Sequence, residues 1–190
     1  PQQPQADGGL TPAPNRRADE GRGPYKTLVI RGVTLIDGSG APPQGPVDIV
    51  VSGNRIASVR SAGTPGLAMR TNRAPQNADL EVDATGMYLM PGFVDMHVHA
   101  GGAPKNAEAE YAYKLWLAHG VTTVRGVPLG NNSVTVADKL RSQKNEIVAP
   151  RIVNYQRPGA GWDKGQPDTP EAARAWAQWA SQNGVEGLKL

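Results

Sequence analysis

The sequence contains no cysteine and only three histidines in 190 residues. The absence of cysteine excludes disulfide bonds, thiolate metal sites and a cysteine nucleophile, so any metal ion must bind nitrogen or oxygen ligands. No apolar run reaches the roughly 20 residues that a helix needs to span a bilayer, so no membrane span is expected. Basic residues barely outnumber acidic ones, 20 against 17, and form no dense run. This pattern argues against a nucleic-acid partner.

Residues 1–24 are rich in proline and glycine and show no hydrophobic periodicity. They are predicted to form a flexible tail, or an arm that orders on a partner. The chain starts without methionine, in a Pro/Gln-rich stretch that is typical of a mature end left by signal-peptide removal. We therefore expect a periplasmic or secreted protein, although an artificially shortened chain would start in the same way.

Residues 25–90 contain short β-branched runs that are separated by turn residues. The runs are "TLVIRGVTLIDGSG", "VDIVVSGNRIASVR" and "LEVDATGMYLMPG". Val47, Ile49 and Val51 alternate with Asp48 and Val50, and Gly53-Asn54 has the spacing of a hairpin turn. This pattern predicts a small antiparallel β domain, of the kind that forms a β-sandwich segment, with a less regular loop at residues 61–79.

Residues 91–190 alternate strand-like with helix-like patterns. The strand-like runs are "FVDMHVH", "VTTVRGV", "RIVNY" and "VEGLKL", and "DTPEAARAWAQWASQNG" has the cap, proline and apolar face of a helix. Repeated βα units predict an α/β fold with a parallel sheet and right-handed crossovers. Four such units are half of an eight-stranded TIM barrel.

The stretch "MPGFVDMHVHA" holds two of the three histidines, His97 and His99, on an apolar strand. Residues two apart on a strand point to the same side, so the two imidazoles project together with Asp95 one layer below. At the C-terminal mouth of a barrel, they could chelate one divalent ion. Two ordinary histidines at a strand end are the alternative, because so short a motif is weakly specific.

At this point the sequence resembles the amidohydrolase superfamily, in its branch with a β-sandwich segment and a carboxylated lysine, near imidazolonepropionase and prolidase. The resemblance covers residues 25–190. It rests on four stretches in order, which are "LMPGFVDMHVH", "HGVTTVRGV", "APRIV" and "TPEAARAWAQWASQNGVEGLKL". It implies the first four βα units, residues 91–190, of a (β/α)8 barrel preceded by the β-sandwich segment of residues 25–90.

The resemblance also implies a binuclear metal centre, most suitably zinc. His97 and His99 match the two histidines that bind the more buried ion, and Lys189 matches a lysine that carbon dioxide converts to a bridging carbamate. A metal-bridged hydroxide then attacks the substrate carbonyl, which makes Lys189 part of the catalytic group. Burial of Lys189 in the barrel would favour the neutral amine that reacts with carbon dioxide. An ordinary surface lysine is the alternative reading.

The implied activity is hydrolysis of amide bonds, in dipeptide-like or N-acyl amino-acid substrates. There are two alternatives: a hydrolase of cyclic amides, and a non-catalytic scaffold subunit that keeps the half-barrel. Tyr155, Arg157 and Trp162 follow the third barrel strand and are predicted to contact substrate, with Arg157 able to pair a carboxylate. A plain surface loop is an equal alternative for them.

Two departures from the family pattern bear on this reading. Gly126 replaces the acid that usually follows an arginine at the position of Arg125. The histidines of the second metal and the proton-shuttling aspartate belong to later strands that this chain lacks. We therefore expect a C-terminal half, supplied as a separate chain, to complete the barrel in a homo- or hetero-oligomer.

Overall fold

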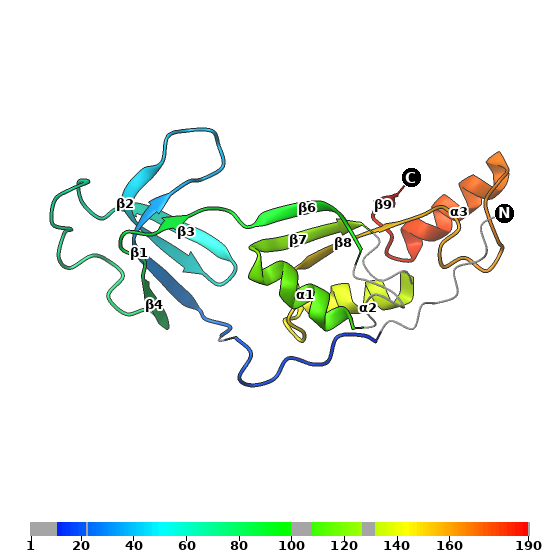
Figure 1. Cartoon of the computed structure of the whole chain (residues 1–190), viewed down its shortest axis with the longest axis horizontal. Coiled ribbons are helices and arrows are strands. Elements are labelled where there is room, and N and C mark those ends of the chain that lie inside the picture. The colour runs from blue at the N-terminus through cyan, green and yellow to red at the C-terminus, as the bar shows by residue number, and fades with distance from the viewer. Residues whose placement is uncertain (1–10, 22, 100–107, 127–131, 190) are drawn as a thin grey trace. The chain divides into compact units, whose positions relative to one another are not determined.

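The computed structural model describes residues 11–21, 23–99, 108–126 and 132–189. The chain divides into two compact units (Figure 1). One is a β-sheet unit formed by Gly21–Pro91, and the other is an α/β unit formed by Gly92–Leu190 together with the residues up to Glu20. Each unit is described by itself below.

The β-sheet unit is one five-stranded sheet in the order β3-β2-β1-β4, with β5 also paired to β1. The antiparallel pairs are β1 with β2 and β2 with β3, whereas β4 and β5 run parallel to β1. Its strands are β1 (Thr27–Leu35), β2 (Gln44–Ser52), β3 (Arg55–Ser61), β4 (Leu80–Asp83) and β5 (Tyr88–Leu89). Gly53 joins β2 to β3 at a φ of 57°, in the left-handed region that glycine tolerates best. The predicted hairpin is therefore present.

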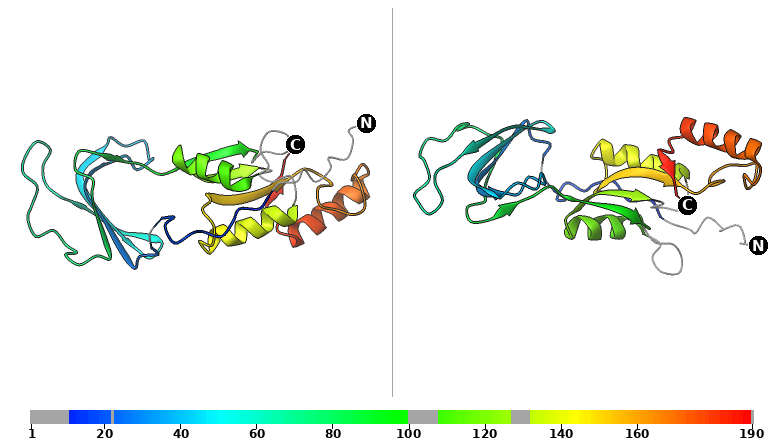
Figure 2. Two further views of the ribbon diagram at one scale, coloured as in Figure 1. Left: turned by 60° about the horizontal axis from the view of Figure 1, so that its bottom comes forward. Right: turned by 90° about the horizontal axis from the view of Figure 1, so that it is seen from above.

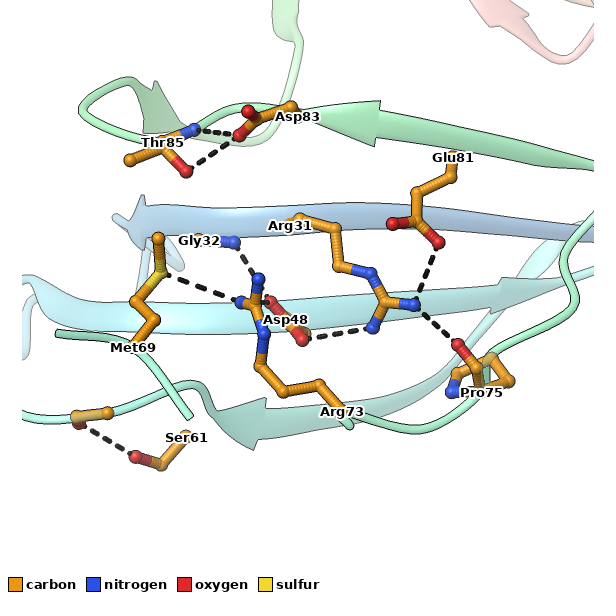
Figure 3. A network of polar contacts seen from close by, with 11 residues as sticks. Arg31, Gly32, Asp48, Ser61, Met69, Arg73, Pro75, Glu81, Asp83 and Thr85 are labelled. Carbon is orange, nitrogen blue, oxygen red and sulfur yellow. Dashed lines mark hydrogen bonds and ion pairs between the residues drawn. The ribbon is translucent and has the colours of Figure 1, made fainter. Parts of the chain in front are cut away.

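A β-sandwich is not confirmed, because the described residues of this unit form a single sheet. One face is apolar and buries Val33, Val47 and Ile49. The other face carries the buried charged residues Arg31 and Asp48. The residues between β3 and β4 cover them instead of a second sheet (Figure 3). Charged groups need polar partners when buried, which this segment supplies and an apolar sheet face would not.

The α/β unit has a parallel four-stranded sheet in the order β6-β7-β8-β9, which confirms the predicted βα repeats. The strands curl as in half of a barrel. The elements are β6 (Phe93–Val98), α1 (Ala109–Ala118), β7 (Val121–Gly126), α2 (Asn132–Gln143), β8 (Arg151–Gln156), α3 (Pro170–Gln182) and β9 (Gly187–Leu188). Helix α1 lies against β7 and α2 against β8 (Figure 2).

Local sequence explains where the helices begin and end. Thr169 caps α3, because its hydroxyl accepts a hydrogen bond from the backbone N–H of Ala172 at 3.2 Å, and Pro170 occupies the first helical position. Gly184 follows the helix at a φ of 76°. Within the described residues, the helices have at most 13 residues, and none could cross a membrane.

Residues 11–20 are part of the α/β unit, whereas the sequence predicts a flexible tail for residues 1–24. Ala13 is buried in the core cluster, and its N–H donates to the Asp138 carboxylate at 3.5 Å. The N–H of Arg16 donates to the carbonyl of Glu146 at 2.7 Å, and Glu20 pairs with Lys114. The difference arises because distant partners hold this segment: the Asp138 carboxylate on α2 accepts from Ala13, and the Lys114 ammonium on α1 pairs with Glu20. Local composition does not reveal such partners.

The buried Tyr113–Asp138 pair in this core makes a testable contribution to stability. The Tyr113 hydroxyl donates to the Asp138 carboxylate at 3.2 Å, and both residues are fully buried. Burial, and next the negative charge of Asp138, raise the pKa of Tyr113 far above its ordinary value. The folded state therefore keeps this proton at a pH where the unfolded state has lost it.

The Tyr113→Phe variant should lower the free energy of unfolding by about 1.5–3 kcal/mol near neutral pH, because a hydrogen bond to a charged group is lost. Above pH ~10, the wild type should lose up to about 1.4 kcal/mol of stability per pH unit through this residue, and Tyr113→Phe should lack that part of the slope. Urea unfolding at several pH values measures both effects. Tyr111→Phe, on the exposed side of the same helix, is the matched control. Equal slopes in wild type and Tyr113→Phe would contradict the assignment.

Candidate metal centre

The two histidines of the candidate site lie at the C-terminal end of β6. His97 is in the strand and His99 follows it directly, so both rings project to the same side. Their Nε2 atoms are 3.3 Å apart, and the rings are tilted by 49°. The backbone N–H of His97 donates to the Asp95 carboxylate at 3.0 Å, which fixes the strand end from one layer below.

The third group, Lys189, comes from the opposite edge of the sheet. It follows β9, and its backbone N–H donates to the carbonyl of Gln156 at 2.9 Å, which continues the ladder with β8. Its Nζ lies 3.1 Å from Nε2 of His99. Since β6 and β9 are the two outer strands of the sheet, this contact depends on the curl of the strands. The predicted convergence of Lys189 with the histidines is thus present in the geometry.

Gly126, at the end of β7, has no side chain and so leaves room for the end of β6 and for the Lys189 amine. Its φ is 141°, and a Cβ atom added there would lie 2.9 Å from the carbonyl oxygen of Val98 and 3.7 Å from the Lys189 amine. A side chain at this position would collide with β6 before it reached the amine. The glycine noted in the sequence as a missing acid is therefore also a requirement of close strand approach.

Electrostatics at the site favour the uncharged forms of the nitrogen groups. Burial, and next the charge of Lys189, lower the pKa of His99, with smaller effects of His97 and Arg157. Burial, and next the charge of Arg157, lower the pKa of Lys189, whose side chain is 8% exposed. Both shifts increase the fraction of free nitrogen lone pairs, which metal ions and carbon dioxide require.

The predicted substrate residues differ in their distance from this cluster. Arg157 follows β8, and its charge acts on both His99 and Lys189. The ring of Tyr155 lies against Gly187, where an added Cβ would be 2.3 Å from the ring. The indole of Trp162 faces the Lys164 ammonium at 5.8 Å. The adjoining Gly161 lies against α2 and α3 rather than the cluster.

One residue near the site was not among the predicted substrate contacts. The guanidinium of Arg125, on β7, lies 4.0 Å above the centre of the Tyr155 ring. The sequence showed the arginine but not its partner, because the two residues come from different strands 30 positions apart. A stacked pair of this kind is visible only after the strand register is known.

The donor set fits a divalent ion that prefers nitrogen and oxygen. Two ligands at the usual zinc–nitrogen distance of about 2.0–2.1 Å in a tetrahedral site lie about 3.3 Å apart, which is the separation of the two Nε2 atoms. Among the described residues, no three His, Cys, Asp or Glu side chains cluster around a possible ion. The nearest further nitrogen group that the structure places there is the Lys189 amine, 3.1 Å from Nε2 of His99.

Known proteins resemble the chain both in sequence and in fold. An N-acyl-D-aspartate deacylase from Alcaligenes xylosoxydans xylosoxydans is 36% identical over 118 residues, which are 61% of this chain and 20% of the relative. A dihydroorotase from Thermus aquaticus is 27% identical over 124 residues, 64% of this chain and 25% of the relative. No protein-family profile matches the sequence.

In fold, a crystal structure of a Xaa-Pro dipeptidase aligns with a TM-score of 0.58 and 22% identity, over 85% of this chain and 46% of that structure. These relatives point to the amidohydrolase superfamily, each over part of its length. It spans a quarter or less of the length of these two curated relatives and under half of the dipeptidase. The curled parallel sheet and this partial coverage fit one part of an amidohydrolase barrel.

Proposed function

We propose that this chain supplies part of the active site of a metal-dependent hydrolase of amide bonds. The observation that carries the proposal is the meeting of His97, His99 and Lys189 at the C-terminal ends of the two outer strands. Active sites of (β/α)8 enzymes form at this end of the strands. The curated relatives are hydrolases that act on C–N bonds, which supports the same reaction class.

Zinc is the metal that we propose, because imidazole and carboxylate-like ligands suit it. His97 and His99 would hold the metal through Nε2, and Lys189 as a carbamate would supply oxygen ligands. A bound divalent ion supplies an acidified water and polarises the scissile carbonyl. The chain's own contribution is to orient the two imidazoles on a rigid strand end, where Asp95 holds the backbone of His97.

Lys189 is suited to carbamate formation because burial shifts it toward the neutral amine. The amine nitrogen attacks the carbon of carbon dioxide, a C–N bond forms, and one proton leaves to solvent. The product is an anion with two oxygen ligands. This change would turn a buried cation, which is costly in a protein interior, into an anionic group whose charge bound metal would neutralise.

Arg157 would bind the carboxylate of an N-acyl amino acid or dipeptide-like substrate. Its guanidinium has no carboxylate partner among the described residues, and its charge reaches both Lys189 and His99. A guanidinium binds a carboxylate through two parallel hydrogen bonds, which fixes the orientation of the substrate. The scissile amide would then lie beside the metal cluster.

We further propose that additional βα units, from a C-terminal half of the enzyme, complete the barrel. Within the part of the chain that the structure describes, β6 and β9 each pair with one strand only. Large apolar side chains are half exposed on these outer strands, namely Phe93, Val94, Met96 and Leu188. Parallel sheets are normally covered on both faces, so a further partner for these edges is expected.

The complete enzyme that contains this chain should bind two equivalents of zinc and release amino acid from N-acetyl amino acids. A chelator should abolish the release, and zinc with bicarbonate should restore it. Full hydrolysis by a metal-free enzyme would overturn the proposal. Absence of zinc even after reconstitution with bicarbonate would support a scaffold role instead.

Substitution of a residue that only hydrogen-bonds to a metal ligand typically weakens metal binding by roughly 10–100-fold. His97→Asn removes a ligand itself and should weaken zinc binding by more than this. Competition with a zinc-binding dye measures this affinity. His119→Asn is the matched control, because the third histidine only bonds the Leu115 carbonyl at the end of α1. Equal zinc affinities in the two variants would remove His97 from the site.

A further inference from the structure

A row of cations lies on one face of the parallel sheet, beside the proposed metal site. Arg125 pairs in register with Val153, and Tyr155 is two residues further along the same strand, so Arg125 and Tyr155 share a face. Tyr155 in turn pairs with Gly187, and Lys189 is two residues beyond. Arg157 follows Tyr155 by two residues, and its charge acts on Lys189. The row is therefore formed by two arginines, Arg125 and Arg157, with Lys189 beside them.

No carboxylate neutralises this row among the described residues. Neither Arg125 nor Arg157 makes an ion pair there, and the neighbouring acid Asp95 is bonded to the backbone of His97. Residues 100–107 and 127–131, which follow the same strand ends in sequence, contain no acidic residue. Among the described residues, the buried Arg31 and the partly buried Arg73 have carboxylate partners. The partly buried Arg125 has none in that part of the chain.

Stacking on Tyr155 holds Arg125 in place but leaves its hydrogen-bonding edge free. The guanidinium lies 4.0 Å above the ring and is half-buried. A stacked guanidinium uses its faces, and its N–H groups point outward in the plane, where a carboxylate can accept two of them. A side chain that is already oriented loses less entropy when it binds a ligand.

We infer that Arg125, stacked on Tyr155, is a second carboxylate receptor and makes the enzyme prefer acidic substrates, such as N-acyl derivatives of aspartate or glutamate. This inference rests on the proposed function, in which Arg157 holds the first carboxylate. Arg125 lies one step deeper along the same face, so it would bind the carboxylate of the substrate side chain. It is a specificity residue and takes no part in bond cleavage.

The test compares acidic substrates with neutral ones of the same shape, in the complete enzyme. N-acetylaspartate and N-acetylglutamate, in both configurations, are measured against N-acetylasparagine and N-acetylglutamine. The wild type should favour the acid over the amide by about 10–100-fold in kcat/KM, as expected for a hydrogen-bonded charge pair. Arg125→Met should remove this preference. Arg125→Lys, which keeps the charge without the planar fork, should retain only part of it.

Two further variants separate this role from a structural one. Arg157→Met should lower kcat/KM for acid and amide alike and so leave their ratio near that of the wild type. Arg151→Met, at the opposite end of β8, should change neither. A wild type without acid preference, or an Arg125→Met variant that keeps it, would overturn the inference while hydrolysis continued to support the proposed function.

Calorimetry keeps the two claims independent. Binding of N-acetylaspartate and N-acetylasparagine is measured for wild type and Arg125→Met. A preference for the acid that disappears in Arg125→Met supports the receptor even if nothing is hydrolysed, in which case only the proposed function fails. Equal affinities of both compounds for the wild type would overturn the receptor. Loss of binding of both compounds in Arg125→Met would also overturn the receptor. It would mean that Arg125 has a structural role in the complete enzyme, as the partner of an acidic group of the protein.

Discussion

Replacing Lys189 with methionine should lower amide hydrolysis by the complete enzyme by on the order of 10³-fold, since several kcal/mol of transition-state stabilisation depend on a correctly held metal. Methionine preserves the length of the side chain but can neither react with carbon dioxide nor supply an oxygen ligand. The loss should appear in kcat, because the proposed substrate contacts are not touched. Zinc content should fall in parallel, toward one ion per site.

Two controls make this result specific to the carbamate. Lys144→Met removes an exposed lysine after α2 and should have no effect. In the smaller variant Lys189→Ala, added short-chain carboxylates should partly restore amide hydrolysis, because they can take the place of the missing carbamate. Unchanged kcat in Lys189→Met would exclude the lysine from the metal site, and with it the central geometric argument for the function.

Asp48→Asn should destabilise the β-sheet unit by about 3–5 kcal/mol, the usual cost of removing one partner of a buried ion pair. Asp48 is 2% exposed and accepts three hydrogen bonds, from Arg31 at 3.0 Å, Arg73 at 2.7 Å and the backbone N–H of Gly32 at 2.9 Å. Without its charge, the guanidinium groups of Arg31 on β1 and of Arg73 on the segment between β3 and β4 lose the carboxylate that they share (Figure 3). The segment between β3 and β4 should loosen with them.

Amide hydrogen exchange in β1 and β2 measures this effect within the unit that contains the network. Exchange should become faster in Asp48→Asn, and the residues around Arg73 and Pro75 should lose protection first, because their contacts end on Asp48 and Arg31. Asp37→Asn is the matched control, since Asp37 is exposed and bonds only its neighbour Ser39. A change of less than about 0.5 kcal/mol, the range of ordinary surface substitutions, would show that the network adds no stability.

Local patterns predicted the secondary structure well where short-range physics decides it. The helix that starts at Pro170 was predicted from its cap and its apolar face, and the hairpin at Gly53 from the turn residues. The second sheet of a sandwich was not confirmed. In the sequence, Asp48 has the pattern of a solvent-facing residue of β2, whereas in the structure partners from distant segments bury it.

The candidate site shows the same division. His97 and His99 are two residues apart on one strand, so strand geometry alone places their rings together. The proximity of Lys189 to these histidines was predicted only from the family resemblance, since 90 residues separate it from His99. The stacking of Arg125 on Tyr155 had no local signal, because it depends on the register of β7 against β8.

The amino-acid sequence by itself determined the order of the elements, the absence of thiol chemistry and the pairing of two imidazoles, because each follows from neighbouring residues and strand or helix periodicity. Only the tertiary structure decided that residues 11–20 lie against α1 and α2, that Asp48 is buried between two arginines, and that the amine of Lys189 reaches His99. These contacts join segments far apart in the chain, and their partners are chosen by how the sheets curl and which charges they must neutralise.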